Sequence, residues 1–219
     1  MGRKKLIRFS DNKLSPNVLQ QGKEMYDLIK GNWNKTYFKN NNPIVVELAC
    51  GYGEYTIGLA KQFPHQNFIG IDIKGERLAV GSRIAAVENL TNVAFLRINI
   101  HFLLDFFELG EVSEIWIIFP DPFSSRSSPA RRLTHPKYLK LYDSILVLGG
   151  KIYLKTDSEL MFESSLDSFV SYGVSDLFAT DNYYNSPLFD PSKNFKTRFE
   201  QIFSERGYSI KFIGCSLKR

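Results

Sequence analysis

The segment of residues 114–132, EIWIIFPDPFSSRSSPARR, contains the side chains best suited to chemistry in this sequence. Its apolar start predicts a buried strand, which is followed by Asp121 and by a loop with three arginines. In open α/β sheets, ligands bind beyond the carboxyl ends of the strands. Pro120 lacks a backbone N–H and Pro122 favours an extended backbone at Asp121, so the turn is stiff. We therefore expect Asp121 to be a catalytic or substrate-holding acid; the alternative is an aspartate that only caps a turn.

A glycine turn forms the second candidate site. Glu47 lies inside the segment VELACGYG (46–53), and Asp72 ends the next apolar segment, 21 residues after Gly51. Glycines let the backbone approach a ligand closely, and an acid about 20 residues downstream of such a turn commonly binds ribose hydroxyls. This spacing predicts a nucleoside-containing cofactor. The alternative is an ordinary strand-to-helix turn with an acid nearby by chance.

The type of cofactor follows from what the turn lacks. The dinucleotide fingerprint G-x-G-x-x-G would need glycine at position 56, which is Thr56, and no phosphate-binding GK[ST] motif is present. A nicotinamide oxidoreductase is excluded on this ground. An acid inside the strand, Glu47, disfavours a polyphosphate and suits a cationic ligand such as the sulfonium of S-adenosylmethionine.

Alternating strand and helix patterns would bring both candidate sites to one edge of a sheet. We expect an α/β fold with a doubly wound, mostly parallel sheet of about seven strands and a reversed last strand. The expected strands are residues 44–48, 67–72, 93–98, 115–119, 151–155, 174–179 and 209–213. The expected helices are 54–62, 74–88, a short one at 100–107, 136–146, 158–171 and 195–206.

Length and composition indicate one domain. With 219 residues, of which 43% are hydrophobic, the chain suits a single core, formed by a domain at 43–219. Residues 1–42 are expected to be a polar, mostly irregular N-terminal arm with a possible short helix near 18–29. The absence of a signal-peptide pattern and of a long apolar run predicts a cytoplasmic protein without a membrane segment.

Net charge, cysteine content and the positions of the histidines limit the partners and metal sites that the sequence suggests. Lys and Arg outnumber Asp and Glu by 28 to 23, a formal charge of +5 that permits an anionic partner without requiring one. Cys50 and Cys215 are expected to be reduced structural thiols. The three histidines are scattered, with no helical i,i+4 pair, so we expect neither a metal site nor a catalytic histidine.

Together these motifs resemble the bacterial tRNA (guanine-N7-)-methyltransferase family, class I enzymes that use S-adenosylmethionine. The resemblance covers residues 40–213 and rests on VELACGYG (46–53), FIGID (68–72), FPDPF (119–123), RRLTHPKYL (131–139), KTD (155–157) and TRFEQIF (197–203). It implies methyl transfer from S-adenosylmethionine to N7 of the guanine at position 46 of the tRNA, in the variable loop. It further implies tRNA as partner, no metal, and a monomer or homodimer.

The resemblance also implies roles for individual residues. Asp121 matches the catalytic acid, and the cofactor-binding positions are Glu47, Gly51, Gly53, Asp72 and Asn99. The substrate-binding positions are Ser125, Arg126, Arg131, Arg132, Asp157, Thr197, Arg198, Phe199 and Glu200. For the mechanism, we expect Asp121 and Asp157 to accept hydrogen bonds from the guanine N1–H and N2–H edge. Thr197 and Glu200 would close the pocket, and Phe123 or Tyr184 would stack on a splayed base.

The sequence departs from the family at several positions. Ala49 replaces the first glycine of the cofactor turn, Asn99 replaces an aspartate, and Phe123 replaces a tryptophan. Ser125 replaces a substrate-binding lysine within a loop that is serine-rich instead of basic. These losses predict weaker binding of tRNA phosphates. They also leave two alternatives: a methyltransferase for another RNA or a small molecule, and a non-catalytic RNA-binding relative.

Overall fold

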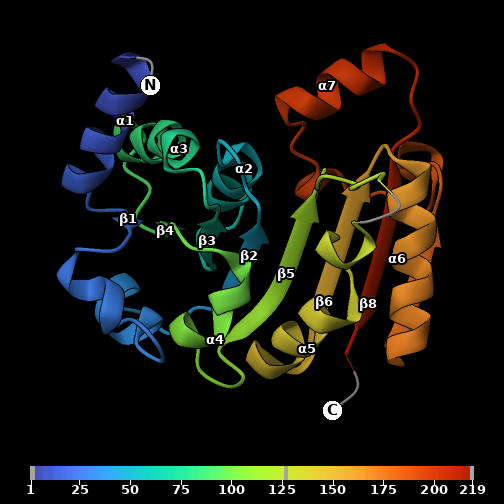
Figure 1. Ribbon diagram of the computed structural model, residues 1–219, viewed down its shortest axis with the longest axis horizontal. Helices are drawn as coiled ribbons and strands as arrows, with labels where there is room; N and C mark the ends of the chain where they lie inside the picture. Colours follow the sequence, from blue (N-terminus) through green and yellow to red (C-terminus); the bar gives the residue numbers. More distant parts are fainter. Residues whose placement is uncertain (1–2, 126–127, 218–219) are drawn as a thin grey trace.

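A mixed β-sheet runs through the part of the chain that this computed structural model describes, residues 3–125 and 128–217 (Figure 1). Its eight strands lie in the order β1-β4-β3-β2-β5-β6-β8-β7. β8, the last strand in the chain, runs antiparallel to both β6 and β7, so the predicted reversed last strand is confirmed. The strands are β1 Val18–Leu19, β2 Ile44–Leu48, β3 Asn67–Ile71, β4 Val93–Leu96, β5 Val112–Ile118, β6 Leu146–Thr156, β7 Ser175–Thr180 and β8 Lys211–Ser216.

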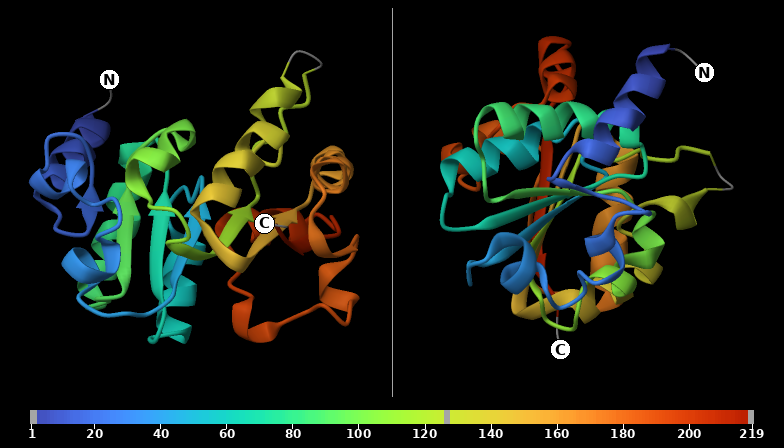
Figure 2. Two further views of the ribbon diagram at one scale, coloured as in Figure 1. Left: turned by 90° about the horizontal axis from the view of Figure 1, so that it is seen from below. Right: turned by 90° about the vertical axis from the view of Figure 1, so that its left-hand side faces the viewer.

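Helices cover both faces of the sheet, as the alternating pattern predicts (Figures 1 and 2). On one face, α2 (Glu54–Gln62) and α3 (Gly75–Val87) pack side chains such as Tyr55 and Leu78 against the sheet. On the other face, α4 (Leu103–Phe106), α5 (Pro136–Ile145) and α6 (Glu159–Tyr172) do the same. Strand β2 is entirely buried, and strands that are buried on both faces have nearly continuous apolar sequences. Glu47 is the exception in this strand.

The N-terminal arm differs from the prediction, because it is ordered and joins the sheet. It forms α1 (Arg3–Leu14), strand β1, a 3₁₀ turn at Glu24–Asp27 and a π-helical turn at Trp33–Phe38. The expected helix near 18–29 is wrong, since its first residues form β1. The signal was weak because none of the residues between Gln20 and Ile29 is buried, so the buried positions of the arm form no sustained helical or strand period.

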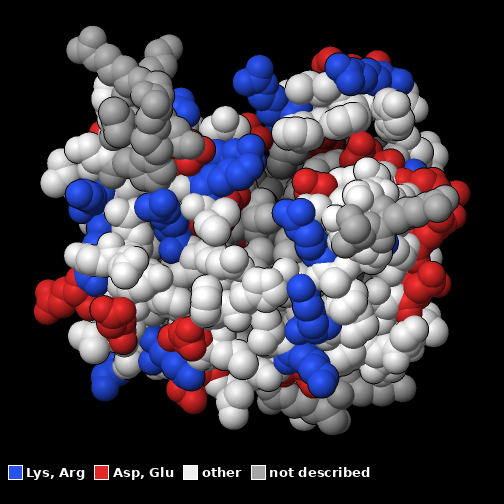
Figure 3. Space-filling view, viewed as in Figure 1, with Lys and Arg blue, Asp and Glu red and all other residues white. Residues whose placement is uncertain are grey.

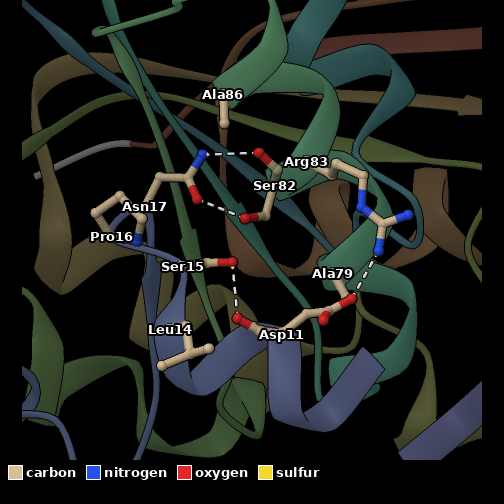
Figure 4. Close-up of a pocket in the computed structure, with 9 residues that line it drawn as sticks. All are labelled: Asp11, Leu14, Ser15, Pro16, Asn17, Ala79, Ser82, Arg83 and Ala86. Atoms are coloured by element: carbon tan, nitrogen blue, oxygen red, sulfur yellow. Dashed lines mark hydrogen bonds and ion pairs between the residues drawn. The ribbon is translucent and has the colours of Figure 1, made fainter. Parts of the chain in front are cut away.

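Polar contacts dock the arm on α3 around a shallow hollow of about 300 Å³ (Figure 4). Asp11 of α1 pairs with Arg83 of α3 at 2.6 Å. The amide of Asn17 donates to the backbone oxygen of Ser82 at 3.0 Å and its oxygen accepts from the Ser82 hydroxyl. The polar groups drawn in the hollow therefore satisfy one another and serve docking.

The C-terminal third follows the prediction in outline, with shifted boundaries. Helix α7 spans Arg198–Glu205 because the Thr197 side chain caps it, accepting from the backbone N–H of Glu200 at 3.2 Å. Strand β6 is longer than expected, since Gly149 and Gly150 lie within it instead of ending the preceding helix. Short 3₁₀ turns lie at Ile100–Phe102, Pro129–Arg131, Tyr183–Asn185 and Pro191–Lys193. No helix in the described ranges is long and apolar enough to cross a bilayer.

Candidate active site

A cleft of about 980 Å³ opens at the carboxyl ends of β2, β3, β4, β5 and β6. Glu47, Asp72, Asn99, Asp121 and Asp157 line it, although they come from five different strands or strand ends. Parallel strands end at one edge of a sheet, which brings residues distant in sequence together. Figure 3 shows the face of the molecule hollowed below α7, with Lys and Arg side chains on both sides of the hollow.

The glycine turn places backbone N–H groups next to an acid. Ala49, Gly51 and Gly53 all have positive φ, at 56°, 58° and 71°. One oxygen of Asp72 accepts from the Gly51 N–H at 2.9 Å, and the other accepts from the Lys74 N–H at 2.8 Å. Each carboxylate oxygen keeps a lone pair for a further donor, so Asp72 is held in place and still able to bind a hydroxyl.

Gly53 supports this turn without lining the cleft. A Cβ at this position would lie 2.5 Å from Cε1 of Phe95, which leaves no room for a side chain. Asn99 lies in the cleft wall, where its Oδ1 accepts from the His101 N–H at 3.1 Å. That hydrogen bond aims the amide, and its NH₂ group remains available as a donor.

Glu47 is a buried acid with an altered pKa. Its side chain accepts from both the backbone N–H of Thr56, at 2.8 Å, and the Thr56 hydroxyl. Burial raises the pKa of Glu47 to about 8, with smaller upward contributions from Asp72 and Glu54, although the Thr56 bonds act in the opposite direction. A nearby cation would favour the ionised form, which fits a positively charged ligand. Thr56 is therefore the partner of Glu47, a role that its position in the sequence does not reveal.

The FPDPF turn holds Asp121 at the cleft. Phe119 and Phe123 have φ of 47° and 43°, conformations that non-glycine residues rarely adopt. One oxygen of Asp121 accepts from the Phe123 N–H at 2.9 Å, while the Phe119 N–H donates to the carbonyl of Lys155 at 2.9 Å. Asp121 is exposed and lines the cleft. It thus caps a turn and also faces the cleft, so the two interpretations of its role are compatible.

The two arginines after this turn differ in what they contact. The Arg131 guanidinium lies over the Phe123 ring, 4.4 Å from its centre, and lines the cleft. Arg132 is half-buried, and its Nε donates to the Pro122 carbonyl at 2.9 Å, so it holds the loop in shape. Ser125 is exposed but does not line the cleft. The expected contact at residue 126 lies outside the described residues.

Lys137 lines the cleft and lies within the motif RRLTHPKYL (131–139), but it is not among the site residues expected from the sequence. It is exposed in the first turn of α5 and, like Arg131, adds a positive charge to the cleft lining. A lysine next to a proline at the start of a helix is usually solvated, so there was no reason from the sequence alone to expect Lys137 at a ligand site.

Within the segment 197–200, some residues line the cleft and others do not. Thr197 and Phe199 line the cleft, and Phe199 is 61% exposed. Arg198 is exposed outside the cleft lining, with its backbone N–H bonded to Glu54 at 3.0 Å. Glu200 is fully buried and pairs with Lys155 at 2.8 Å, so it does not line the cleft. The sequence placed all four on one segment, but only the helix phase decides which of them face the cleft.

Known proteins that are similar to most of this chain are methyltransferases, as the sequence motifs predict. A protein family described as "Putative methyltransferase" matches residues 41–213. A tRNA (guanine-N(7)-)-methyltransferase of Cytophaga hutchinsonii is 40% identical over 215 residues, which cover 97% of this chain and 97% of that protein. The enzyme of the same name from Christiangramia forsetii is 41% identical and covers all of both chains.

A solved structure extends the similarity to the fold. A 16S rRNA methyltransferase superimposes with a TM-score of 0.64, covering 93% of this chain and 99% of the other. Its sequence identity is 11%, so the likeness concerns the arrangement of strands and helices. The doubly wound sheet with one antiparallel strand is therefore the class I methyltransferase fold.

Proposed function

Because the chain belongs to the family of tRNA (guanine-N(7)-)-methyltransferases, we propose that it methylates N7 of the variable-loop guanine in tRNA, using S-adenosylmethionine. The observation that supports this proposal best is the convergence of Glu47, Asp72, Asp121, Asp157 and Thr197 on one cleft. We assign methyl transfer to residues 43–219. The enzyme would act in the cytoplasm as a monomer or homodimer.

The residues of the cofactor end fit S-adenosylmethionine. The volume of the cleft lies at the upper end of the range usual for small-molecule sites, and the turn at Gly51 leaves the backbone accessible. Asp72 would bind the ribose hydroxyls, Asn99 the adenine, and Glu47 would stabilise the positive charge of the ligand. When bound, the cofactor supplies an electrophilic methyl group on a sulfonium.

On the substrate side, the residues have to position a guanine more than activate it. Guanine N7 carries an exposed lone pair and no proton, so alignment contributes more to the rate than a base would. Asp121 and Asp157 would accept from the N1–H and N2–H donors and so orient N7. Their negative charges would also stabilise the positive charge that develops on the purine.

The remaining residues of the predicted set would hold the RNA or support those that do. Thr197 and Phe199 would contact the target nucleoside, and Arg131 would contact a phosphate. Arg132 and Glu200 would act through the loop and the helix that they hold. Ser125, Arg126 and Arg198 would lie along the path of the RNA backbone.

The proposal is tested by methylating bulk tRNA that lacks the modification and mapping the modified base. We expect one 7-methylguanine per accepting tRNA, in the variable loop, and no product from tRNA with adenine at that position. No 7-methylguanine at saturating cofactor would refute the proposal, and methylation of a different base would assign the cleft to another RNA target. Calorimetric titration with S-adenosylmethionine separates these outcomes from a non-catalytic relative, which would bind no cofactor.

A further inference from the structure

Helix α7 differs from the other helices in how it contacts the protein. It stands above the carboxyl end of the sheet, apart from the layers that the other helices form (Figures 1 and 2). Within α7, all of which is described, Glu200 is the only buried residue. Phe199 and Ile202 are 61% and 37% exposed, and the partly buried Phe203 stacks on Phe199, so no fully buried apolar side chain anchors this helix to the sheet. Besides the hydrogen bond from the Arg198 N–H to Glu54, its buried attachment is therefore a single charged side chain.

That side chain belongs to a buried ion pair with a strand residue next to the cleft. Lys155 Nζ lies 2.8 Å from Oε1 of Glu200, and the two side chains are 1% and 0% exposed. Lys155 lies near the end of β6, two residues before Asp157. Burial lowers the pKa of Lys155, while the charge of Glu200 acts in the opposite direction. The charge of Glu200 therefore favours the protonated form of Lys155 inside the protein.

The loop before α7 completes the network. Tyr184 donates its hydroxyl hydrogen to Glu200, and Lys155 also donates to Oδ1 of Asn194 at 3.1 Å. The Lys155 ammonium lies 5.2 Å from the ring centre of Tyr183 and 5.8 Å from that of Tyr55. Aromatic faces stabilise a cation that has lost its water. The ammonium is thus held from the strand, the loop and the helix together.

Such a pair determines geometry more than stability. Two buried charges give little net stabilisation, because their desolvation offsets their attraction, but they accept few alternative arrangements. Fixing Glu200 fixes the first turn of α7. Thr197, which precedes that turn, and Phe199, which lies within it, then face the cleft in one orientation.

We propose that Lys155 and Glu200 are positioning residues for the tRNA substrate: their buried pair tethers α7 so that Thr197 and Phe199 meet the target nucleoside. The proposal rests on the proposed function, since it deepens the role of the same site. It differs from a direct role of Glu200 in binding guanine, because the carboxylate acts through the helix it holds.

The test compares Lys155→Met with Lys151→Met. Lys151 lies on the same strand and pairs with Asp176 at 3.4 Å, away from the cleft, so it controls for loss of a lysine from β6. For Lys155→Met we expect the KM for tRNA to rise about tenfold and the Kd for S-adenosylmethionine to stay within about twofold. Hydrogen exchange in α7 should become faster. The Lys151→Met variant should match the wild type in all three measurements.

A double-mutant cycle distinguishes tethering from direct contact. If the pair tethers α7, Lys155→Met and Glu200→Gln raise KM by similar factors, and the double variant raises it no further. If Glu200 binds the guanine itself, the two factors multiply and the proposal is overturned. An unchanged KM together with unchanged exchange in α7 would also overturn it.

Two further measurements keep the proposal testable if the Lys155→Met variant does not fold or if the wild type does not methylate tRNA. If Lys155→Met does not fold, Tyr184→Phe removes a single donor to Glu200 and should raise KM by about threefold, with faster exchange in α7. If the wild type methylates no tRNA, the proposed function fails, and the exchange rates still report whether the pair tethers the helix. Slow exchange in α7 of both Lys155→Met and Tyr184→Phe would then refute the tether itself.

Discussion

Replacing Glu47 by glutamine should isolate the free energy that burial of this carboxylate costs. Its pKa is raised from 4.5 to about 8 in the folded protein. A group with a raised folded pKa contributes most stability below its unfolded pKa, and this contribution is lost as the pH rises. In the folded protein Glu47 stays mostly protonated up to pH 7, whereas in the unfolded chain it ionises; from the two values this difference costs the ligand-free protein about 1 kcal/mol of stability at pH 5 and about 3 kcal/mol at pH 7. Glutamine has no such cost and can still accept from the Thr56 N–H.

The assay is urea unfolding of the ligand-free wild type and of Glu47→Gln between pH 5 and pH 8. The variant should be the more stable protein, and its advantage should grow with pH. Other titrating groups are common to both proteins and cancel in the difference. A difference in unfolding free energy that stays constant over this range would refute the reasoning.

Cofactor binding gives an independent measurement of the same group. A cationic ligand favours the ionised carboxylate, so binding at pH 7 should release protons from the wild type. Calorimetry in two buffers of different ionisation enthalpy measures that release. Glu47→Gln should release fewer protons and bind S-adenosylmethionine about tenfold more weakly. Equal proton release in both proteins would show that Glu47 does not meet the cofactor.

Three further substitutions test other parts of the site. Asp121→Asn keeps the acceptor for the Phe123 N–H, so it should lower the rate of methyl transfer by about a hundredfold in single turnovers with cofactor affinity unchanged; parallel loss of both would assign Asp121 to the cofactor. Ser125→Lys should tighten tRNA binding and steepen its salt dependence by about one charge, whereas an unchanged slope would mean that this loop does not meet phosphate. Gly53→Ala should destabilise the protein by about 2 kcal/mol or more, because the new Cβ would lie 2.5 Å from Phe95 at a φ of 71°, and an unchanged unfolding midpoint would contradict this.

The sequence predicted those parts of the fold that have a clear period. The boundaries of β2 and α2 match the expected residues 44–48 and 54–62, because an apolar run and a helical face are local patterns. The two-residue strand β1 has no such pattern. It forms because Val18 and Leu19 find a partner in β4, more than 70 residues later in the chain. Only the tertiary structure holds that information.

The candidate site likewise has some features that follow from local sequence patterns and others that depend on tertiary contacts. Residue types and spacing were sufficient to predict that Asp72 and Asp121 lie at the cleft, since both follow parallel strands. They could not show that Arg132 turns back to bond its own loop, or that Glu200 is buried against Lys155. Those outcomes depend on the phase of a short helix and on contacts between distant segments. A charged residue in a motif therefore indicates a region more safely than it indicates a contact.

The short strand β1 has a practical consequence for shortened forms of the protein. The carbonyls of Asn17 and Leu19 accept from the N–H groups of Phe95 and Arg97, and Val18 is fully buried. A chain trimmed to the residues that match the family, 41–213, would lose this cover. The hydrogen-bonding edge of β4 would then be open to pairing with other molecules, and open edges of apolar strands promote aggregation. Residues 17–19 thus cover an edge that would otherwise favour aggregation, although no described residue of the first 20 lines the cleft.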